Sequence, residues 1–153
     1  MPQNLNKFEY FIGSGLFTGS IKFASGTWGS LAALLIYLVI PGFENATVLL
    51  LLSAFFTVVG IKLGTKFEST YGKDPKEFTL DEVVGMWISL LFIPKKIWYI
   101  ALTFLIWRAM DIIKIPPAKQ AEKLKGGLGI MLDDIIAAFY TVIIVNLLIN
   151  LIS

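Results

Sequence analysis

The acidic residues that could carry chemistry in this chain lie beside the ends of its apolar segments. Five carboxylates share this position, namely Asp81, Glu82, Asp111, Asp133 and Asp134. If those segments are helices packed side by side, carboxylates at their ends meet at one depth. Oxygen-rich clusters of this kind suit hard cations such as Mg²⁺, Mn²⁺ or Ca²⁺. The spacing predicts a metal site formed by Asp81, Glu82, Asp111, Asp133 and Asp134, with Glu122 reaching it from a loop.

Basic side chains accompany these carboxylates along the chain. A divalent cation next to lysine and arginine suits an anionic substrate, and a phosphate ester fits that combination best. Arginine adds a planar fork that can hold two phosphate oxygens at once. We expect the phosphate groups of such a substrate to be held by Lys22, Ser25, Thr27, Arg108, Lys114 and Lys119.

Several of the acidic residues also have purely structural interpretations. Thr79 and Glu82 fit a capping box at the start of a helix. Asp133 and Asp134 could complement the dipole at the start of the last helix. Asp111 is the hardest to explain in this way, because it lies near the C-terminal end of a helix, where the dipole disfavours an anion.

The composition indicates a membrane protein. Of the 153 residues, 56% are hydrophobic and only 16% are charged, whereas soluble domains carry about 25% charged residues. The mean hydropathy is +0.76. The net charge of +2 is too small to indicate a nucleic-acid partner. We therefore expect the lipid bilayer to be the main environment of this chain.

Two residue types are missing and exclude whole classes of enzyme. The chain contains no cysteine, and therefore no disulfide, thiolate nucleophile or cysteine-bound zinc. It contains no histidine, which excludes histidine general bases, phosphohistidine and histidine-bound metals. Any chemistry must use carboxylates, lysine, arginine, hydroxyl groups and a hard metal ion.

Five apolar segments predict the architecture: residues 27–40, 47–63, 80–93, 97–113 and 135–152. Most are shorter than the roughly 20 residues that a membrane span needs. We expect an all-α fold, a compact helical membrane bundle with about four or five short membrane-embedded helices in one domain, 1–153. Gly126-Gly127-Leu128-Gly129 lacks the spacing of a phosphate-binding loop and is predicted to be a hinge.

The polar stretches between these segments predict the orientation. With alternating crossings, residues 22–30, 66–82 and 108–134 share one face and carry most of the lysine and arginine. The positive-inside rule makes that face cytoplasmic, although Lys95 and Lys96 oppose it. We expect a multi-pass protein of the cell inner (cytoplasmic) membrane whose active site faces the cytoplasm. Some of the basic residues could instead serve only as anchors at the interface.

Three motifs carry a resemblance to a known family. They are Gly26-Thr27-Trp28-Gly29-Ser30, Asp81-Glu82-Val83-Val84-Gly85-Met86, and the stretch from Asp111 through Pro116-Pro117 and Glu122 to Asp133-Asp134. With these motifs the chain resembles the phosphatidylglycerophosphatase A family of bacterial membrane lipid phosphatases, over roughly residues 11–145.

The resemblance implies Mg²⁺-dependent removal of the terminal phosphate from phosphatidylglycerophosphate, giving phosphatidylglycerol. Asp81, Asp111, Asp133 and Asp134 are then the expected catalytic residues. Direct attack by water with a carboxylate as base and an aspartyl-phosphate intermediate both remain open, and we favour the first. The expected partners are the lipid substrate and the bilayer, with no nucleic acid and no obligate protein partner evident.

Two other classes of function compete with this interpretation. The acidic cluster could be the cation site of a small ion or solute transporter, or the chain could be a non-catalytic membrane subunit with a charged docking face. Transport sites lie near the middle of the bilayer, whereas these carboxylates are expected at helix ends. The predicted position of the cluster therefore favours the enzyme.

Overall fold

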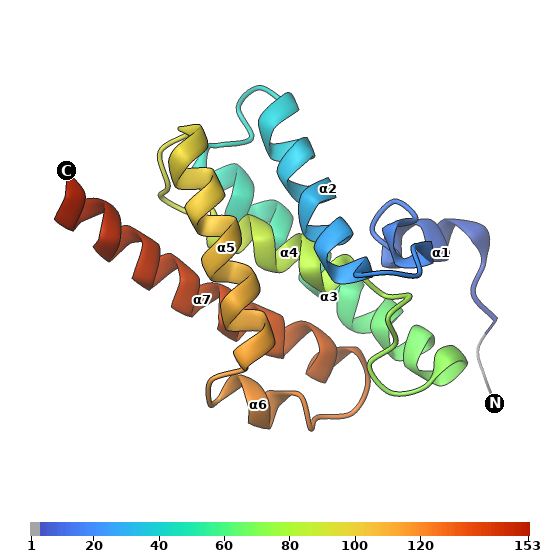
Figure 1. Cartoon of the computed structure of the whole chain (residues 1–153). Coiled ribbons are helices and arrows are strands. Elements are labelled where there is room, and N and C mark those ends of the chain that lie inside the picture. Colours follow the sequence, from blue (N-terminus) through green and yellow to red (C-terminus); the bar gives the residue numbers. More distant parts are fainter. Residues whose placement is uncertain (1–3) are drawn as a thin grey trace.

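The computed structural model describes residues 4–153, and all regular secondary structure in that range is helical, with no strand. In chain order its elements are α1 (Lys7–Gly13), a 3₁₀ turn η1 (Thr18–Ser20), α2 (Ser25–Val39), α3 (Ala46–Tyr71), α4 (Leu80–Ser89), α5 (Ile97–Ile113), α6 (Ala118–Ala121) and α7 (Gly126–Ile152). Figure 1 shows them in one bundle. The predicted all-α class is confirmed for these residues.

The short helix α4 lies at the centre of the bundle. Nine of its ten residues are buried, because α2, α3, α5 and α7 all pack around it. The Trp87 indole donates a hydrogen bond to the Ala33 carbonyl of α2 at 3.1 Å, and its ring packs against Phe43 and Phe56. These contacts fix α4 along its length, so the two acidic residues of its first turn, Asp81 and Glu82, are held in place by the core.

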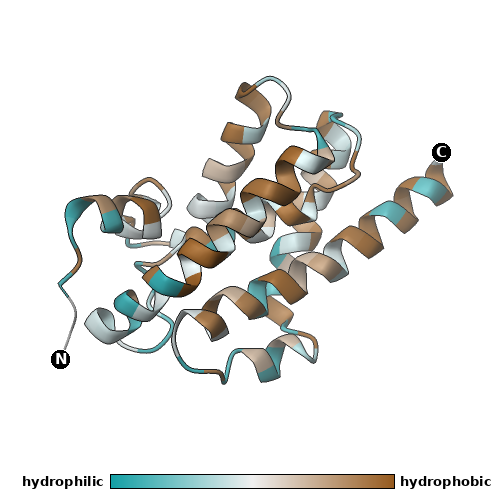
Figure 2. Ribbon diagram, turned by 180° about the vertical axis from the view of Figure 1, so that it is seen from behind, coloured by the Kyte–Doolittle hydropathy of each residue, from teal (hydrophilic) through white to brown (hydrophobic). Residues whose placement is uncertain are grey.

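Two helices, α3 and α7, are long and apolar enough to cross a membrane, with 26 and 27 residues. Figure 2 shows hydrophobic residues along most of the length of the helices, with hydrophilic residues gathered mainly near helix ends and connections. Among residues 4–153, length and composition thus support two spans rather than four or five. The helix α2 is also apolar but is shorter.

The helix boundaries differ from several predicted ones. α5 occupies the predicted range 97–113, but α3 continues beyond residue 63 to Tyr71, and α4 ends at Ser89 rather than near residue 93. The polar stretch 22–30, which we expected to connect helices, is already helical from Ser25. Polar side chains interrupt the apolar pattern of α3 and of the start of α2 without ending the helix, whereas α4 ends at Ser89 although the apolar pattern continues to Ile93.

The glycines before the last helix form its first turn and are not a hinge. α7 begins at Gly126, and an added Cβ at Gly127 would lie 2.0 Å from the backbone oxygen of Ile61 in α3. The Gly127 N–H also donates to Thr65 Oγ1 at 2.9 Å. The lack of a side chain at Gly127 therefore lets α3 and α7 touch through their backbones.

Replacing Gly127 with alanine is expected to destabilise the bundle. The methyl group must displace the α3 backbone, and overpacking of this kind costs about 1–3 kcal/mol. That loss exceeds the roughly 1 kcal/mol that alanine gains over glycine in helix propensity. Thermal unfolding in detergent would measure the change, with the exposed neighbour Leu128→Ala as control. An unchanged midpoint for G127A would show that the two helices separate easily.

Candidate active site

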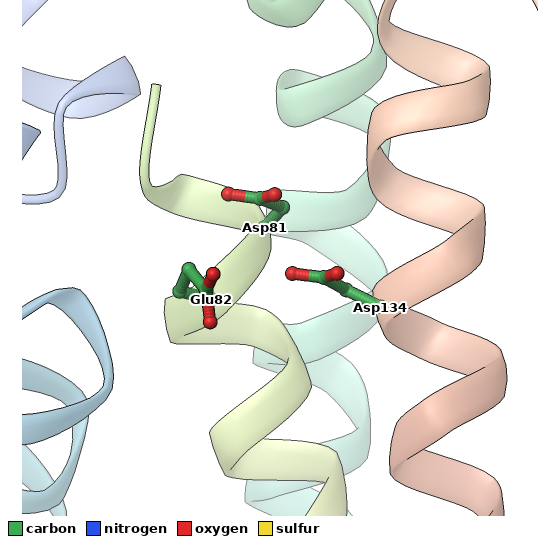
Figure 3. A group of neighbouring side chains, drawn as sticks. All are labelled: Asp81, Glu82 and Asp134. Carbon is green, nitrogen blue, oxygen red and sulfur yellow. The ribbon is translucent and has the colours of Figure 1, made fainter. Parts of the chain in front are cut away.

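Three carboxylates converge where α4 meets α7. Asp81 and Glu82 come from the first turn of α4, and Asp134 comes from α7. One oxygen from each lies within 4.8 Å of the others, and Figure 3 shows the Asp81 and Asp134 carboxylates between the two helices with Glu82 beside them. Asp81 is 7% exposed and Asp134 is 3% exposed. We call Asp81, Glu82 and Asp134 the carboxylate trio.

Two buried oxygens of the trio have no hydrogen-bond partner within residues 4–153. They are Asp81 Oδ1 and Asp134 Oδ2. A buried carboxylate oxygen without a donor loses its hydration and gains nothing in return, so such atoms normally bind a proton or a cation. Both atoms therefore indicate that a positively charged ligand belongs at this point of the fold.

Arg108 joins a fourth carboxylate to the trio. Its Nη1 donates to Glu82 Oε2 at 2.7 Å and to Asp111 Oδ2 at 2.8 Å. Asp111 lies three residues further along α5, on the same helix face. The guanidinium thereby offsets the unfavourable placement of an anion near the C-terminal end of α5.

Lys114 forms ion pairs with Asp133 and Glu122, the two remaining predicted metal ligands. Its Nζ lies 2.8 Å from Asp133 Oδ2 and 3.3 Å from Glu122 Oε1. Lys114 ends α5 in a left-handed backbone conformation, which turns the chain toward α6. Burial alone would lower the pKa of Lys114, but hydrogen bonding and charge interaction with Asp133 raise it above its usual range. Lys114 therefore stays charged at neutral pH.

The predicted capping box at α4 is wrong. Thr79 makes no side-chain cap and instead shares a 2.8 Å hydrogen bond with Thr18 Oγ1. Glu82 turns toward α2 and α5, where it meets Arg108 and, at 3.4 Å, the Ser30 hydroxyl. The dipole interpretation of Asp133 and Asp134 also fails, because both lie about two turns inside α7, beyond the reach of the terminal dipole.

Two residues that position Glu82 were missed by the sequence analysis. The buried indole of Trp107 donates to Ser30 Oγ at 3.1 Å. The single hydroxyl proton of Ser30 can go either to the Gly26 carbonyl, at 3.1 Å, or to Glu82 Oε2, at 3.4 Å. A Cβ at Gly26 would lie 2.5 Å from Glu82 Oε1, so glycine makes room for this carboxylate. The sequence signal that could have found them is the spacing of Gly26, Gly29 and Ser30, which places these small residues on one face of α2, toward α4.

The other predicted phosphate-binding residues lie outside this network. Ser25 is buried and donates to the Lys76 carbonyl at 2.8 Å. Thr27 is half-buried in the first turn of α2. Lys22 and Lys119 are exposed and form no ion pair among the described residues. These four side chains are not brought together with Arg108 and Lys114 by any hydrogen bond or ion pair in residues 4–153.

The trio fits a hard divalent cation. All donors are carboxylate oxygens, which Mg²⁺ and Ca²⁺ prefer, and opposite ligands of such an ion are about 4–5 Å apart. Burial, and then the charge of Glu82, raises the pKa of Asp81 well above its usual range. Burial, and then Asp111, raises the pKa of Glu82 to about 8. Without a cation, these carboxyls hold protons that a cation would have to displace.

The fold and the site define a class: an all-helical protein with two helices long and apolar enough to cross a membrane and with a buried acidic centre. Beside this centre, Arg108 pairs with Glu82 and Asp111, and Lys114 pairs with Glu122 and Asp133. The family model described as "Phosphatidylglycerophosphatase A" matches residues 11–149. The chain belongs to this family and is a phosphatase.

Individual relatives agree on a lipid phosphatase. A Haemophilus influenzae protein named "Phosphatidylglycerophosphatase A" is 35% identical over 89% of this chain and 85% of its own length. The Escherichia coli protein of the same name is 32% identical over 84% and 76%. A Bacteroides thetaiotaomicron protein named "Putative phosphatidylinositol-3-phosphatase" is 38% identical over 88% and 89%. No solved structure matches the chain.

Proposed function

We propose that this chain, as a single domain of residues 1–153, removes the terminal phosphate of phosphatidylglycerophosphate and leaves phosphatidylglycerol, with Mg²⁺ as cofactor. The observation that carries the proposal is the carboxylate trio, in which two buried oxygens have no hydrogen-bond partner among residues 4–153. The family of the chain and the names of two relatives support the substrate. A phosphate monoester is the kind of group that such a site, flanked by two cations, can hold.

Each side chain has a distinct part in this proposal. Asp81, Glu82 and Asp134 would hold the ion, which supplies positive charge to the phosphoryl oxygens. Asp111 orients Arg108 toward the phosphate, and Asp133 does the same for Lys114.

A carboxylate of this cluster would also accept the proton of the attacking water. We favour this direct attack by water over an aspartyl-phosphate intermediate. An aspartyl-phosphate intermediate would need a carboxylate that does not bind the ion and that lies in line with the phosphorus. Direct attack by water has no such requirement.

We place the protein in the inner, cytoplasmic membrane as a multi-pass protein with the site facing the cytoplasm. α3 and α7 support two spans. α2 and α5 add exposed apolar side chains, among them Leu35 (62% exposed) and Leu105 (65% exposed). In water, apolar faces of this size would favour aggregation, whereas in a bilayer they meet acyl chains.

A phosphate-release assay with purified protein in mixed micelles tests the proposal. We expect release from phosphatidylglycerophosphate with Mg²⁺, loss with EDTA, and recovery when Mg²⁺ is returned. Phosphatidylinositol 3-phosphate belongs in the same assay, because one relative carries that substrate in its name. A higher kcat/KM for the inositol lipid would overturn the assignment of phosphatidylglycerophosphate as the substrate. No release from either lipid would favour a transporter or a non-catalytic subunit.

The apparent Mg²⁺ affinity is expected to rise with pH. The pKa of Asp81 is raised well above its usual range and that of Glu82 is raised to about 8, so both carboxyls are protonated below those values. A cation must then displace protons, and it binds more tightly as pH rises through this range. Calorimetric titration with Mg²⁺ from about pH 5.5 to 8.5 checks this. An affinity that stays flat would mean that the carboxylates are already ionised and well separated.

A further inference from the structure

The N-terminal part of the chain exposes large apolar side chains that the proposed reaction does not use. We call residues 7–28 the N-terminal aromatic segment; it comprises α1, η1 and the first turn of α2. Phe8 is 72% exposed and Phe23 is 83% exposed. The exposed apolar residues of the segment are Phe8, Leu16, Phe17, Ile21, Phe23 and Trp28. Six such residues in so short a stretch mark a surface that meets something apolar.

This segment is firmly attached to the rest of the protein. Tyr10 stacks on Phe67 of α3 with ring centroids 5.7 Å apart. The Thr79 N–H donates to the Gly13 carbonyl at 2.9 Å, directly before α4. An ion pair between Glu9 and Lys66 adds a third connection. The exposed aromatic rings therefore lie on a fixed platform rather than on a loose tail.

The backbone of the segment keeps two apolar side chains at the surface. Leu16 and Phe17 have φ values of 59° and 67°, in the left-handed region that residues with a Cβ rarely adopt. Conformations of this kind cost of order 1 kcal/mol or more each and persist where the surrounding structure imposes them. Here they leave Leu16 47% and Phe17 51% exposed. Both side chains stay about half exposed, so burial in the core does not offset the cost of their backbone conformation. Contact with an apolar environment outside the protein would offset it.

The position of the segment identifies that environment. It packs on the C-terminal end of α3, where Lys62 and Lys66 end the apolar stretch of a candidate span. The first turn of α4, which carries Asp81 and Glu82, lies at this same end, because the Thr79 N–H directly before it bonds to Gly13 of α1. Figure 1 shows α1 beside the start of α2. Lys7 and Lys22 add exposed positive charge within the segment. Aromatic rings next to lysine, at the end of a span, are typical of the interface between acyl chains and headgroups.

We propose that the N-terminal aromatic segment binds the acyl-chain and headgroup boundary of the leaflet on the same side as the carboxylates. Phe8, Phe17 and Phe23 enter the apolar side of that boundary, and Lys7 and Lys22 meet anionic headgroups. The contact sets the depth of the carboxylate trio at the level where a lipid carries its phosphate. The proposal rests on the membrane location given under the proposed function.

Site-directed spin labelling tests this contact directly, because the chain contains no cysteine that would have to be removed first. Phe8→Cys and Phe23→Cys each place a nitroxide at an exposed position, in protein reconstituted into vesicles of phosphatidylcholine and phosphatidylglycerol. Oxygen collects in the bilayer and a nickel chelate stays in water, so their collision rates report depth. Leu147→Cys on the exposed apolar face of α7 and Lys125→Cys in the polar loop are the two reference positions.

We expect the labels at 8 and 23 to collide several-fold more with oxygen than with the nickel chelate, at a depth shallower than the label at 147. The label at 125 should show the reverse preference. If 147 lies in lipid while 8 and 23 behave like 125, the segment does not bind the membrane and the inference fails alone. If 147 also behaves like 125, the membrane location fails, and this inference fails with it.

Discussion

Asp134→Asn is expected to lower kcat by more than about a hundredfold, since even groups that only orient metal ligands contribute about ten- to a hundredfold. Asparagine keeps the shape of the side chain but removes the charge from a buried oxygen that has no partner within the described residues. Asp81→Asn should behave in the same way, because Asp81 Oδ1 is also buried without a hydrogen-bond partner among the described residues. Phosphate release at saturating lipid and Mg²⁺ measures both variants.

The fold of these variants should survive or gain stability. The raised pKa of Asp81 means that the folded protein disfavours the ionised carboxyl, which therefore destabilises the fold at neutral pH, and an amide removes this cost. Thermal unfolding without added Mg²⁺ should therefore give midpoints at or above that of the parent protein. Added Mg²⁺ should raise the midpoint of the parent but not that of the variants.

Glu44→Gln is the matched control for the loss of one carboxylate. Glu44 forms an exposed ion pair with Lys95 at 3.2 Å, at the turn between α2 and α3, away from the trio. Its replacement should leave turnover and the effect of Mg²⁺ unchanged. Full activity in both D81N and D134N would refute the assignment of the trio as a metal site.

The sequence predicted the class of fold and the approximate position of the carboxylates for a simple reason. Apolar segments in this chain are separated by polar stretches, and a helix end is where a polar stretch begins, as it is for Asp81 and Asp111. The range of α5 was predicted correctly because Pro94 before it and Pro116 after it limit the helix. The local sequence was therefore sufficient where a single residue type, here proline, decides where a helix can begin or end.

Tertiary contacts decided what the sequence could not show. Glu82 and Thr79 have the spacing of a capping box, yet Arg108, 26 residues later, takes the Glu82 carboxylate instead. Ser30 and Trp107 are 77 residues apart, and no local pattern links them. Likewise, three glycines before α7 resemble a hinge until the α3 backbone is seen to lie against Gly127.

Arg108→Ala is expected to reduce kcat/KM by about a hundred- to a thousandfold, the range typical for loss of one donor that stabilises charge in the transition state. It should also destabilise the fold. Glu82 and Asp111 would lose their shared cation while they stay largely buried, with side chains 13% and 11% exposed. Leaving a buried acceptor without its donor costs about 1–3 kcal/mol. Steady-state kinetics and thermal unfolding measure the two effects separately.

Arg108→Lys distinguishes phosphate binding from a purely structural role. Among residues 4–153, both ion pairs of Arg108 use Nη1, which leaves Nη2 and Nε for a phosphate oxygen. A lysine ammonium could replace Nη1 between Glu82 and Asp111, but it has no second arm of the fork. R108K should therefore recover most of the stability that R108A loses, yet keep a raised KM and a lowered kcat. Recovery of both stability and kinetics would show that Arg108 only holds the two carboxylates together. The second positive charge at the phosphate would then have to come from elsewhere, with Lys114 as the first residue to test.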